Sequence, residues 1–251
     1  MKVKSENYTH EFHYLSANEI FFDRKQKYCP GYEEIDVYGG FWSFLFAKLP
    51  EGSVTICINN KDVSVSGAIG VFIPAHAVVH WKINSPFLHW FAYSNRLPAD
   101  DNFPKDLTLF SLPNFEKEIS PEWIREFIVK SSDKLVLSQM HINPYAKKLK
   151  TLLDKDYKLN TSLQSYALGL GISKEWLIKY FKKSYGLTPI NYRNRKRLMD
   201  TLFALHVDKE KIVDLSHDMG FQDLKHFNAL FKKVISALPS QFLPGKLALE
   251  Y

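Results

Sequence analysis

The sequence predicts an α+β protein, with an antiparallel β-barrel in the N-terminal half and an all-α domain in the C-terminal half. Three observations carry this prediction. Short runs of β-branched and aromatic residues alternate with turn sequences up to residue 93. From residue 120 onward, apolar residues recur with helical spacing instead. In the last part of the chain, two similar segments follow one another, and each has the pattern of two helices joined by a tight turn.

The β-rich half contains six expected strands. Each is a short run rich in β-branched and aromatic residues, and turn sequences such as Pro-Glu-Gly, Ser-Gly and Asn-Ser-Pro separate them. The asparagines at 59–60 fit a tight hairpin because asparagine tolerates positive φ. Six strands at this spacing are typical of an antiparallel sandwich or barrel. The expected bounds are 41–49, 54–58, 62–66, 69–73, 78–83 and 87–93.

Helix signals begin at Ser120, which is an N-cap residue followed by a proline that favours the first turn. The apolar stripe of this helix, which includes Trp123 and Phe127, fits either a dimerisation element or packing on the barrel. Asn143 before another proline predicts the start of a second helix. The expected domains are therefore a barrel over 1–118, a helical linker over 119–142 and a helical domain over 143–251.

An internal repeat carries most of the functional information. Residues 163–192 and 212–242 align with each other, with Gly171 matching Gly220 and a Phe-Lys-Lys run recurring fifty residues later. Each copy predicts a short helix, a turn at the glycine, and a second helix that begins after an N-cap at Ser173 or Asp223.

The second helix of each copy is expected to place its exposed face in the DNA major groove. Side chains on that face would then contact base edges or phosphates. The expected DNA-contacting residues on and beside these helices are Ser173, Lys174, Glu175, Ile178, Lys179, Gln222, Asp223, Leu224, Lys225, His226 and Asn228.

A connecting helix over about 189–206 would be roughly 27 Å long, which is close to the distance between successive major grooves once the width of the units is added. Its basic side chains would lie near phosphates or pair with acids such as Asp200. These side chains are Arg193, Arg195, Lys196 and Arg197.

Charge is distributed unevenly along the chain. Residues 141–251 hold 19 Lys and Arg against 10 Asp and Glu, whereas residues 1–140 hold 14 against 17. A basic C-terminal half favours a polyanionic partner, since neutralising phosphates drives nucleic-acid association. A solvated helical surface explains the charge equally well, and a non-specific nucleic-acid binder is a further alternative. The two spaced helices favour sequence-specific binding.

The C-terminal hundred or so residues resemble the DNA-binding domain of AraC/XylS-type bacterial transcription regulators. The matching patterns are A-x3-G-I-S-x3-L-x3-F-K-K-x2-G-x2-P-x2-Y in the first copy, the Arg197–Leu198 pair, and G-F-x5-F-x3-F-K-K-x5-P-x2-F in the second. The resemblance implies a transcription regulator rather than an enzyme, with double-stranded DNA and RNA polymerase as partners. Ser236 stands where the family usually has glycine, so a regular left-handed helix end is not expected there. For that reason we expect the first unit to be the stronger base reader.

The N-terminal half resembles, more loosely, the cupin-like sensor domain common in that family, around the I-P-A-H-A-V-V-H segment at 73–80. This resemblance implies a small-molecule effector in the barrel, and a homodimer is a further expectation. Aromatic side chains that alternate along the strands are candidate ligand contacts, although ordinary core packing explains each of them as well. The candidates are Trp42, Phe44, His80, Trp81 and Trp90.

Metal, cofactor and membrane sites are not expected. The histidines at 76, 80 and 89 form no H-x-H pair and have no glutamate at ligand spacing, so an enzymatic cupin is the less favoured alternative. The sequence shows neither an apolar run of membrane-spanning length nor a signal-peptide core. Cys29 and Cys57 match no metal or disulfide spacing, which fits a reducing cytoplasm.

Overall fold

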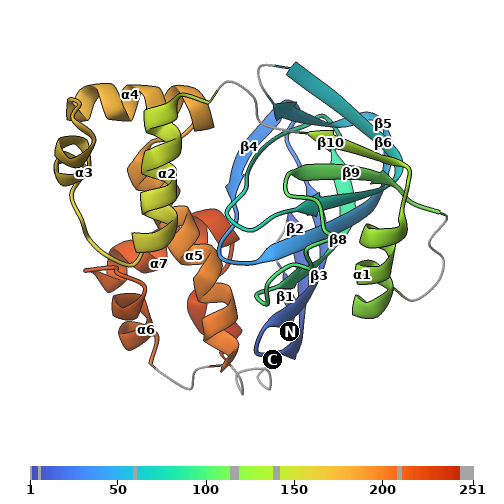
Figure 1. Cartoon of the computed structure of the whole chain (residues 1–251). Helices are drawn as coiled ribbons and strands as arrows, with labels where there is room; N and C mark the ends of the chain where they lie inside the picture. Colours follow the sequence, from blue (N-terminus) through green and yellow to red (C-terminus); the bar gives the residue numbers. More distant parts are fainter. Residues whose placement is uncertain are drawn as a thin grey trace. The chain divides into compact units, whose positions relative to one another are not determined.

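The structure, a computed structural model, describes residues 2–4, 7–58, 61–113, 119–137, 142–207 and 211–243. The chain divides into two compact units: Met1–Asp36 with Gly40–Met140, and Val37–Gly39 with His141–Tyr251. The first unit is built on a sheet and the second on helices (Figure 1). The expected hairpin turn at 59–60 lies outside the described residues.

The first unit contains a ten-stranded sheet in the order β1-β2-β3-β8-β5-β6-β9-β10, with β7 pairing both β5 and β4. Every strand pair with a recorded register is antiparallel, as predicted. The strands are β1 (Lys2–Lys4), β2 (Tyr8–Ser16), β3 (Glu19–Lys27), β4 (Tyr32–Val37), β5 (Trp42–Ile58), β6 (Lys61–Ile73), β7 (Val78–Ile83), β8 (Phe87–Asn95), β9 (Leu107–Ser111) and β10 (Lys134–Leu137).

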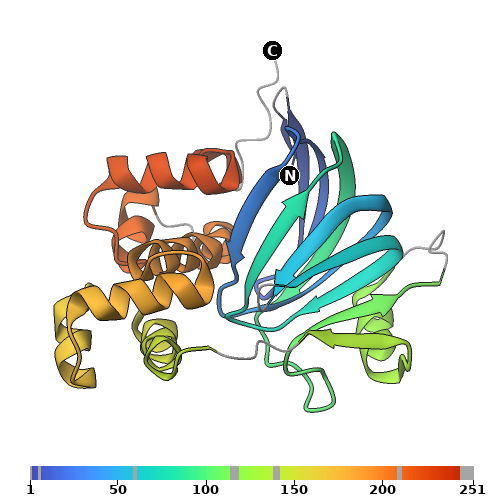
Figure 2. The same cartoon turned by 90° about the horizontal axis from the view of Figure 1, so that it is seen from above.

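The predicted antiparallel β-barrel is only partly formed, because the sheet curves but does not close (Figure 2). Among the described strands, β1 and β10 are the two ends of the ladder and do not pair with each other. Strand β5 explains the branching. It pairs with β8 through residues 42–47 and with β7 through residues 54–57, on either side of a register shift between Leu49 and Val54. One long strand thus serves two arms of the sheet.

Four expected strands merge into two. The runs at 41–49 and 54–58 are both part of β5, and those at 62–66 and 69–73 are both part of β6. The predicted turns between them are local irregularities inside continuous strands, where Gly52 and Gly67 adopt positive φ of 70° and 81°. Strands β1 to β4, β9 and β10 were not predicted, because charged residues interrupt the apolar pattern of β1 to β4 and because β9 and β10 are only five and four residues long.

Helix α1 (Pro121–Lys130) begins at Ser120, whose hydroxyl accepts a hydrogen bond from the Trp123 amide at 3.2 Å, as the sequence predicts. The expected linker is corrected, however. Ile124 and Ile128 are fully buried in the aromatic core of the first unit, and Phe127 contacts Phe44. The helix therefore packs on its own sheet, and β10 extends that sheet beside β9.

The second unit is all-α. It contains α2 (Pro144–Asp156), α3 (Leu163–Leu170), α4 (Lys174–Tyr185), α5 (Pro189–Val207), α6 (Ile212–Asp218), α7 (Leu224–Ile235) and the 3-10 helix η1 (Pro239–Phe242). Helix α5 contacts α2 and α4 as well as α6, α7 and η1, so it joins the two repeat copies as predicted. Among the described residues, no helix is both long and apolar enough to cross a membrane.

Candidate nucleic-acid interface

The first repeat copy forms a helix-turn-helix unit from α3 and α4. Gly171 ends α3 in the left-handed conformation with φ of 69°, and the Ser173 hydroxyl caps α4 by accepting from the Trp176 amide at 3.2 Å. Leu177 and Phe181 are fully buried, which fixes the inward face of α4. Each of these local features agrees with the sequence prediction.

The second copy forms the matching unit from α6 and α7. The Asp223 carboxylate accepts hydrogen bonds from the amides of Lys225 and His226 at 2.9 and 3.2 Å, and Phe227 and Phe231 are buried. The sequence expectation for the end of α7 is corrected: Ser236 does adopt the left-handed conformation, with φ of 64°. The reason for ranking the first helix-turn-helix unit as the stronger base reader is therefore removed.

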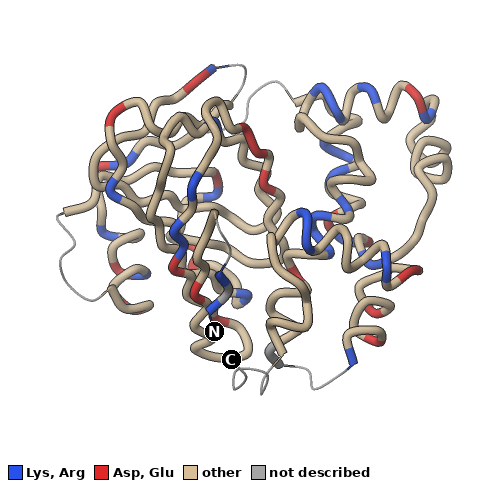
Figure 3. Tube along the Cα trace, turned by 180° about the vertical axis from the view of Figure 1, so that it is seen from behind, with Lys and Arg blue, Asp and Glu red and all other residues tan. Residues whose placement is uncertain are grey.

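The predicted base-contacting side chains mostly lie on the exposed faces of these helices. Lysines occur along both α4 and α7, and Figure 3 marks their positions on the Cα trace. Ile178, Leu224 and Asn228 are half-buried. The exposed members of the predicted set are Ser173, Lys174, Glu175, Lys179, Gln222, Asp223, Lys225 and His226.

Four further lysines were missed as candidate contacts, although their Phe-Lys-Lys runs define the repeat. They lie in the last turns of α4 and α7, and all are exposed. Their recurrence at the same helical position was the available signal. They are Lys182, Lys183, Lys232 and Lys233.

The basic run of α5 points largely inward, which corrects the prediction of phosphate contacts there. Lys196 is completely buried, and its Nζ lies 3.1 Å from Asp154 Oδ1 on α2. Arg193 is half-buried and donates to the Thr161 carbonyl at 2.8 Å. Arg195 is half-buried. The expected pairing with an acid does occur for Lys196, but the acid comes from α2.

Asp154 is the centre of a buried ionic cluster. Its second oxygen accepts from Lys150 Nζ at 2.8 Å, and the Tyr192 hydroxyl donates to the first. Burial opposes ionisation, but Lys150 and Lys196 outweigh it and hold the pKa of Asp154 below its usual value. The carboxylate therefore stays charged and joins α2 to α5.

Arg197 ties the segment before the first helix-turn-helix unit to the second one, a role that its match to the family pattern did not reveal. It is 3% exposed and donates to the carbonyl groups of Tyr157 and Leu159 at 2.6 and 3.0 Å. Its guanidinium also lies over the ring of Phe221, in the turn of the second helix-turn-helix unit. Asn160 in the same segment donates to the Gly220 carbonyl at 3.1 Å. Residues 157–160 therefore contact both the central helix and the turn of the second helix-turn-helix unit.

The five candidate ligand contacts in the β-sheet unit do not form one site. Trp42 and Phe44 are buried in the aromatic core beneath α1. Trp90 lies on the other face of β8 from Tyr93, since side chains alternate along a strand, and Arg24 lies over its ring. Trp81 is 8% exposed on β7.

His80, the remaining candidate, has a carboxylate neighbour that local spacing could not show. Its Nε2 lies 3.2 Å from Glu33 Oε2, which belongs to β4, the strand that pairs with β7. Among the described residues, no group of three or more His, Cys, Asp or Glu side chains is arranged to hold a metal ion.

Residues 166–244 match a family described as a helix-turn-helix domain. Over 94 residues, the chain is 30% identical to the HTH-type transcriptional activator RhaS of Enterobacter sp. (strain 638), covering 38% of this chain and 34% of that protein. It is 33% identical over 86 residues to RhaS of Citrobacter koseri, covering 34% of this chain and 31% of that one. The C-terminal unit is an AraC/XylS-type helix-turn-helix domain. The match spans about a third of the length of these relatives.

The similarity of this chain to a solved structure extends beyond that domain. Its fold resembles fatty-acid-bound ToxT from Vibrio cholerae strain SCE256, with a TM-score of 0.53 and 14% identity, over 98% of this chain and 100% of ToxT. A second ToxT structure gives a TM-score of 0.51 with 14% identity, over 90% and 99% of the two chains. At this identity, the likeness shows a shared fold alone.

Proposed function

We propose that this protein is a sequence-specific DNA-binding transcription regulator whose helices α4 and α7 contact two adjacent major-groove segments. One observation carries the proposal: two helix-turn-helix units, each with an exposed polar face on its second helix, are joined by one central helix. The similarity to RhaS, named a transcriptional activator, supports this function over an enzymatic one.

The two helices offer different chemistry to DNA. Helix α4 presents Lys174, Glu175 and Lys179, whereas α7 presents Lys225 and His226, with Asn228 half-buried beside them. Lysine donates to guanine acceptors and glutamate accepts from cytosine, so both helices carry groups that distinguish bases. The exposed lysines at the ends of α4 and α7, together with Arg195, would contact phosphates and position the domain.

The spacing of the units determines the expected form of the binding site. Helix α5 contains 19 residues and is therefore about 28 Å long. We expect the two contacted segments to be centred roughly 10 to 10.5 base pairs apart, on one face of the duplex.

Selection of bound sequences from a random duplex pool tests this function on the full chain. The expected result is two conserved segments at that spacing, with affinity that falls as salt rises at a log–log slope near −5 if about six phosphates are contacted. Lys225→Ala should relax base preference in one segment only, while Arg195→Ala should weaken all sequences about equally. Selection of no preferred sequence, or affinity that ignores salt, would contradict the proposal.

Control of DNA binding through the first unit is the second part of the proposal. ToxT has been solved with a bound unsaturated fatty acid, and its fold is the one that this chain shares. We expect a small-molecule effector to bind the β-sheet unit. Homodimerisation and contact with RNA polymerase remain predictions from the family resemblance.

A further inference from the structure

Strand β10 forms an apolar edge at one end of the sheet. It is the last strand of the ladder, and among the described strands it pairs with β9 alone (Figure 2). In an edge strand, alternate amide and carbonyl groups point away from the neighbouring strand and can pair with another one. Leu135 and Val136 on β10 are also 54% and 48% exposed. This edge therefore offers both backbone groups and apolar side chains to a further strand.

The opposite end of the sheet is built differently. Strand β1 carries exposed lysines at positions 2 and 4, and Lys2 Nζ lies 2.6 Å from Glu11 Oε1. Lysines on an edge strand oppose the addition of a further strand. Strand β10 has one lysine, Lys134, at its first position, and no charged residue over 135–137. Head-to-tail pairing of β10 with β1 of another copy would place Lys2 and Lys4 beside apolar residues, so the charges disfavour that arrangement.

Strand β10 is complementary to a second copy of itself. Antiparallel pairing about a two-fold axis at Val136 places this valine opposite its own counterpart, and Leu135 opposite Leu137 of the second copy. Each paired position within β10 then joins two apolar residues, and cross-strand pairs of this kind stabilise a sheet. The two copies of Lys134 would lie at opposite ends of the paired segment, roughly 14 Å apart at 3.4 Å per residue. Their charges therefore do not oppose the pairing.

Helix α1 contributes a second apolar surface at this end of the sheet. Trp123 and Phe127 stack on one flank of α1 with ring centroids 4.9 Å apart, and both are half-buried. Phe127 also contacts Phe110 of β9, which is in register with Lys134 of β10. Val136 lies on the same side of the sheet as α1, because it is two residues from Lys134. The Trp123–Phe127 stacks of two copies would thus face the seam from either side.

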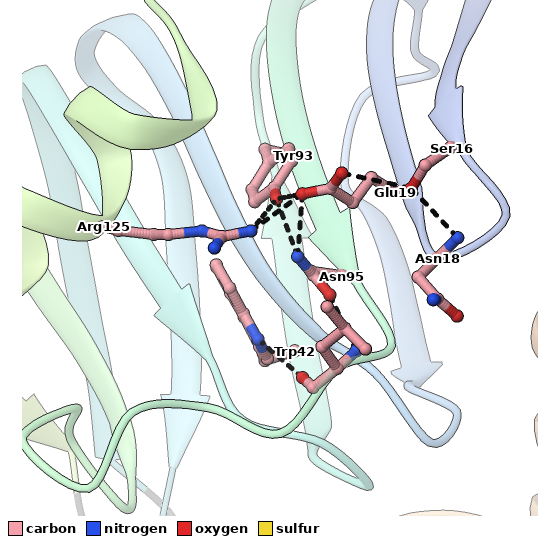
Figure 4. Close-up of polar contacts among 8 residues, drawn as sticks. Ser16, Asn18, Glu19, Trp42, Tyr93, Asn95 and Arg125 are labelled. Carbon is pink, nitrogen blue, oxygen red and sulfur yellow. Dashed lines mark hydrogen bonds and ion pairs between the residues drawn. The ribbon is translucent and has the colours of Figure 1, made fainter.

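Arg125 holds α1 in this orientation. It lies on the flank opposite Trp123, since successive residues of a helix are about 100° apart. Its Nη2 donates to Glu19 Oε1 at 2.8 Å and to the Tyr93 hydroxyl at 3.0 Å. Figure 4 shows the guanidinium reaching from α1 toward these groups. Glu19 and Tyr93 belong to β3 and β8, which lie away from β10 in the order of strands, so the Trp123 flank is left toward β10.

We propose that two copies of this chain associate through β10, which pairs antiparallel with its counterpart about a two-fold axis at Val136 and continues the sheet across the dimer. This pairing occupies the edge in both copies, so assembly stops at two. The contact is small, and we therefore expect a dimer that dissociates in the micromolar range. The inference names the interface of the homodimer expected under the proposed function. Association is measured without DNA, so the two can fail separately.

Sedimentation equilibrium of the full chain over a concentration series tests the association. Val136→Lys places two ammonium groups opposite each other at the axis and should weaken dimerisation at least tenfold. Val129→Lys is the matched control, because Val129 is 41% exposed on the Arg125 flank of α1. It should change dimerisation less than about twofold. Both variants should keep the circular dichroism spectrum of the wild type, since both valines are exposed.

Cysteine substitutions test the register, in a Cys29→Ser background that removes the exposed native thiol. Val136→Cys should give a disulfide-linked dimer on mild oxidation, because residues opposite each other in an antiparallel pair have Cα atoms about 4.5 to 5.5 Å apart. Lys134→Cys should not, since its two copies would lie farther apart than the roughly 7 Å that a disulfide can span.

A chain that stays monomeric throughout the series, a dimer that Val136→Lys leaves intact, or equal linking by the two cysteine variants would overturn the proposal. Growth beyond the dimer would indicate head-to-tail pairing with β1 and would overturn it as well. Sequence selection on random DNA with Val136→Lys runs in parallel. It should still return two segments, because both belong to one chain, and their absence would count against the proposed function alone.

Discussion

The two helix-turn-helix units come from one repeated sequence pattern, yet their turns are packed differently. A Cβ added at Gly171 would meet nothing within 4 Å, whereas one at Gly220 would lie 2.0 Å from the Lys158 carbonyl oxygen and 2.7 Å from Arg197 Nη2. The first turn is open, and the second is closed against the segment before the first unit. The second unit is therefore not an independent copy, because its turn is completed by residues from outside the repeat.

Their supporting contacts differ as well. The first unit packs on α2, and the ionic cluster around Asp154 joins that helix to α5. The second unit ends in the short η1, where Phe242 packs against Phe231. Sequence repetition thus predicts the local structure of both units but not which contacts hold each in place.

The turn glycines provide the largest expected contrast. Gly220→Ala should lower the free energy of unfolding of the second unit by roughly 4 kcal/mol, because the methyl group would overlap backbone and Arg197 in addition to the left-handed strain. Gly171→Ala should cost only about 1 kcal/mol, the strain of a left-handed alanine. Urea denaturation followed by circular dichroism measures both, and equal costs would mean that the two turns are packed alike.

The ionic cluster should affect the first helix-turn-helix unit most. Asp154→Asn should cost about 3 kcal/mol, because it leaves Lys196 buried without its counter-ion. Since the pKa of Asp154 is lowered in the folded state, the stabilisation is present above its unfolded pKa of about 3.9 and is lost as pH falls below that value. Denaturation at several pH values should show this loss in the wild type and a weaker one in Asp154→Asn.

Matched substitutions on the two second helices compare their roles on DNA. Lys174→Ala and Lys225→Ala should each cost about 1 to 3 kcal/mol on the preferred site if both contact bases. Competition binding with sites mutated in one segment at a time assigns each lysine to its segment. A loss that is the same on every sequence would mean that the lysine contacts phosphate instead.

The smallest expected effect is a gain in stability. Ser236→Gly should raise the free energy of unfolding by about 1 kcal/mol, because Ser236 has φ of 64° and glycine adopts that conformation without strain. Ser184→Gly, inside α4, is the control and should be destabilising by about 0.5 kcal/mol. A melting temperature that does not rise in Ser236→Gly would show that the serine side chain offsets its own strain.

Local hydrogen-bond chemistry explains which parts of the structure the sequence could predict. Ser120, Asn143, Ser173 and Asp223 all cap helices as expected, because an N-cap depends on neighbours within three residues. Lys196 could not be placed, since its burial depends on Asp154, which is 42 residues away in the chain. Charge pattern alone assigned it to the surface.

The sheet shows the same limit on a larger scale. Strand β7 was predicted with its observed bounds because its alternation of buried and half-buried residues is regular. Whether the sheet closes depends instead on which strands pair with each other. The pairing of β5 with three strands leaves no local signal in the sequence. The ion pair between Arg125 and Glu19 was missed for a related reason, because it joins α1 to β3.

The contacts of Arg197 and Asn160, which join the central helix to the turn of the second helix-turn-helix unit, have a consequence for the proposed DNA site. Inserting about five base pairs between the two segments of a binding site would rotate one of them to the opposite side of the duplex. A domain with a jointed connection could turn to follow it, but residues 157–160 hold the central helix and the second turn together. Under the proposed binding to two segments, the helical phase of the site would matter as much as its base sequence.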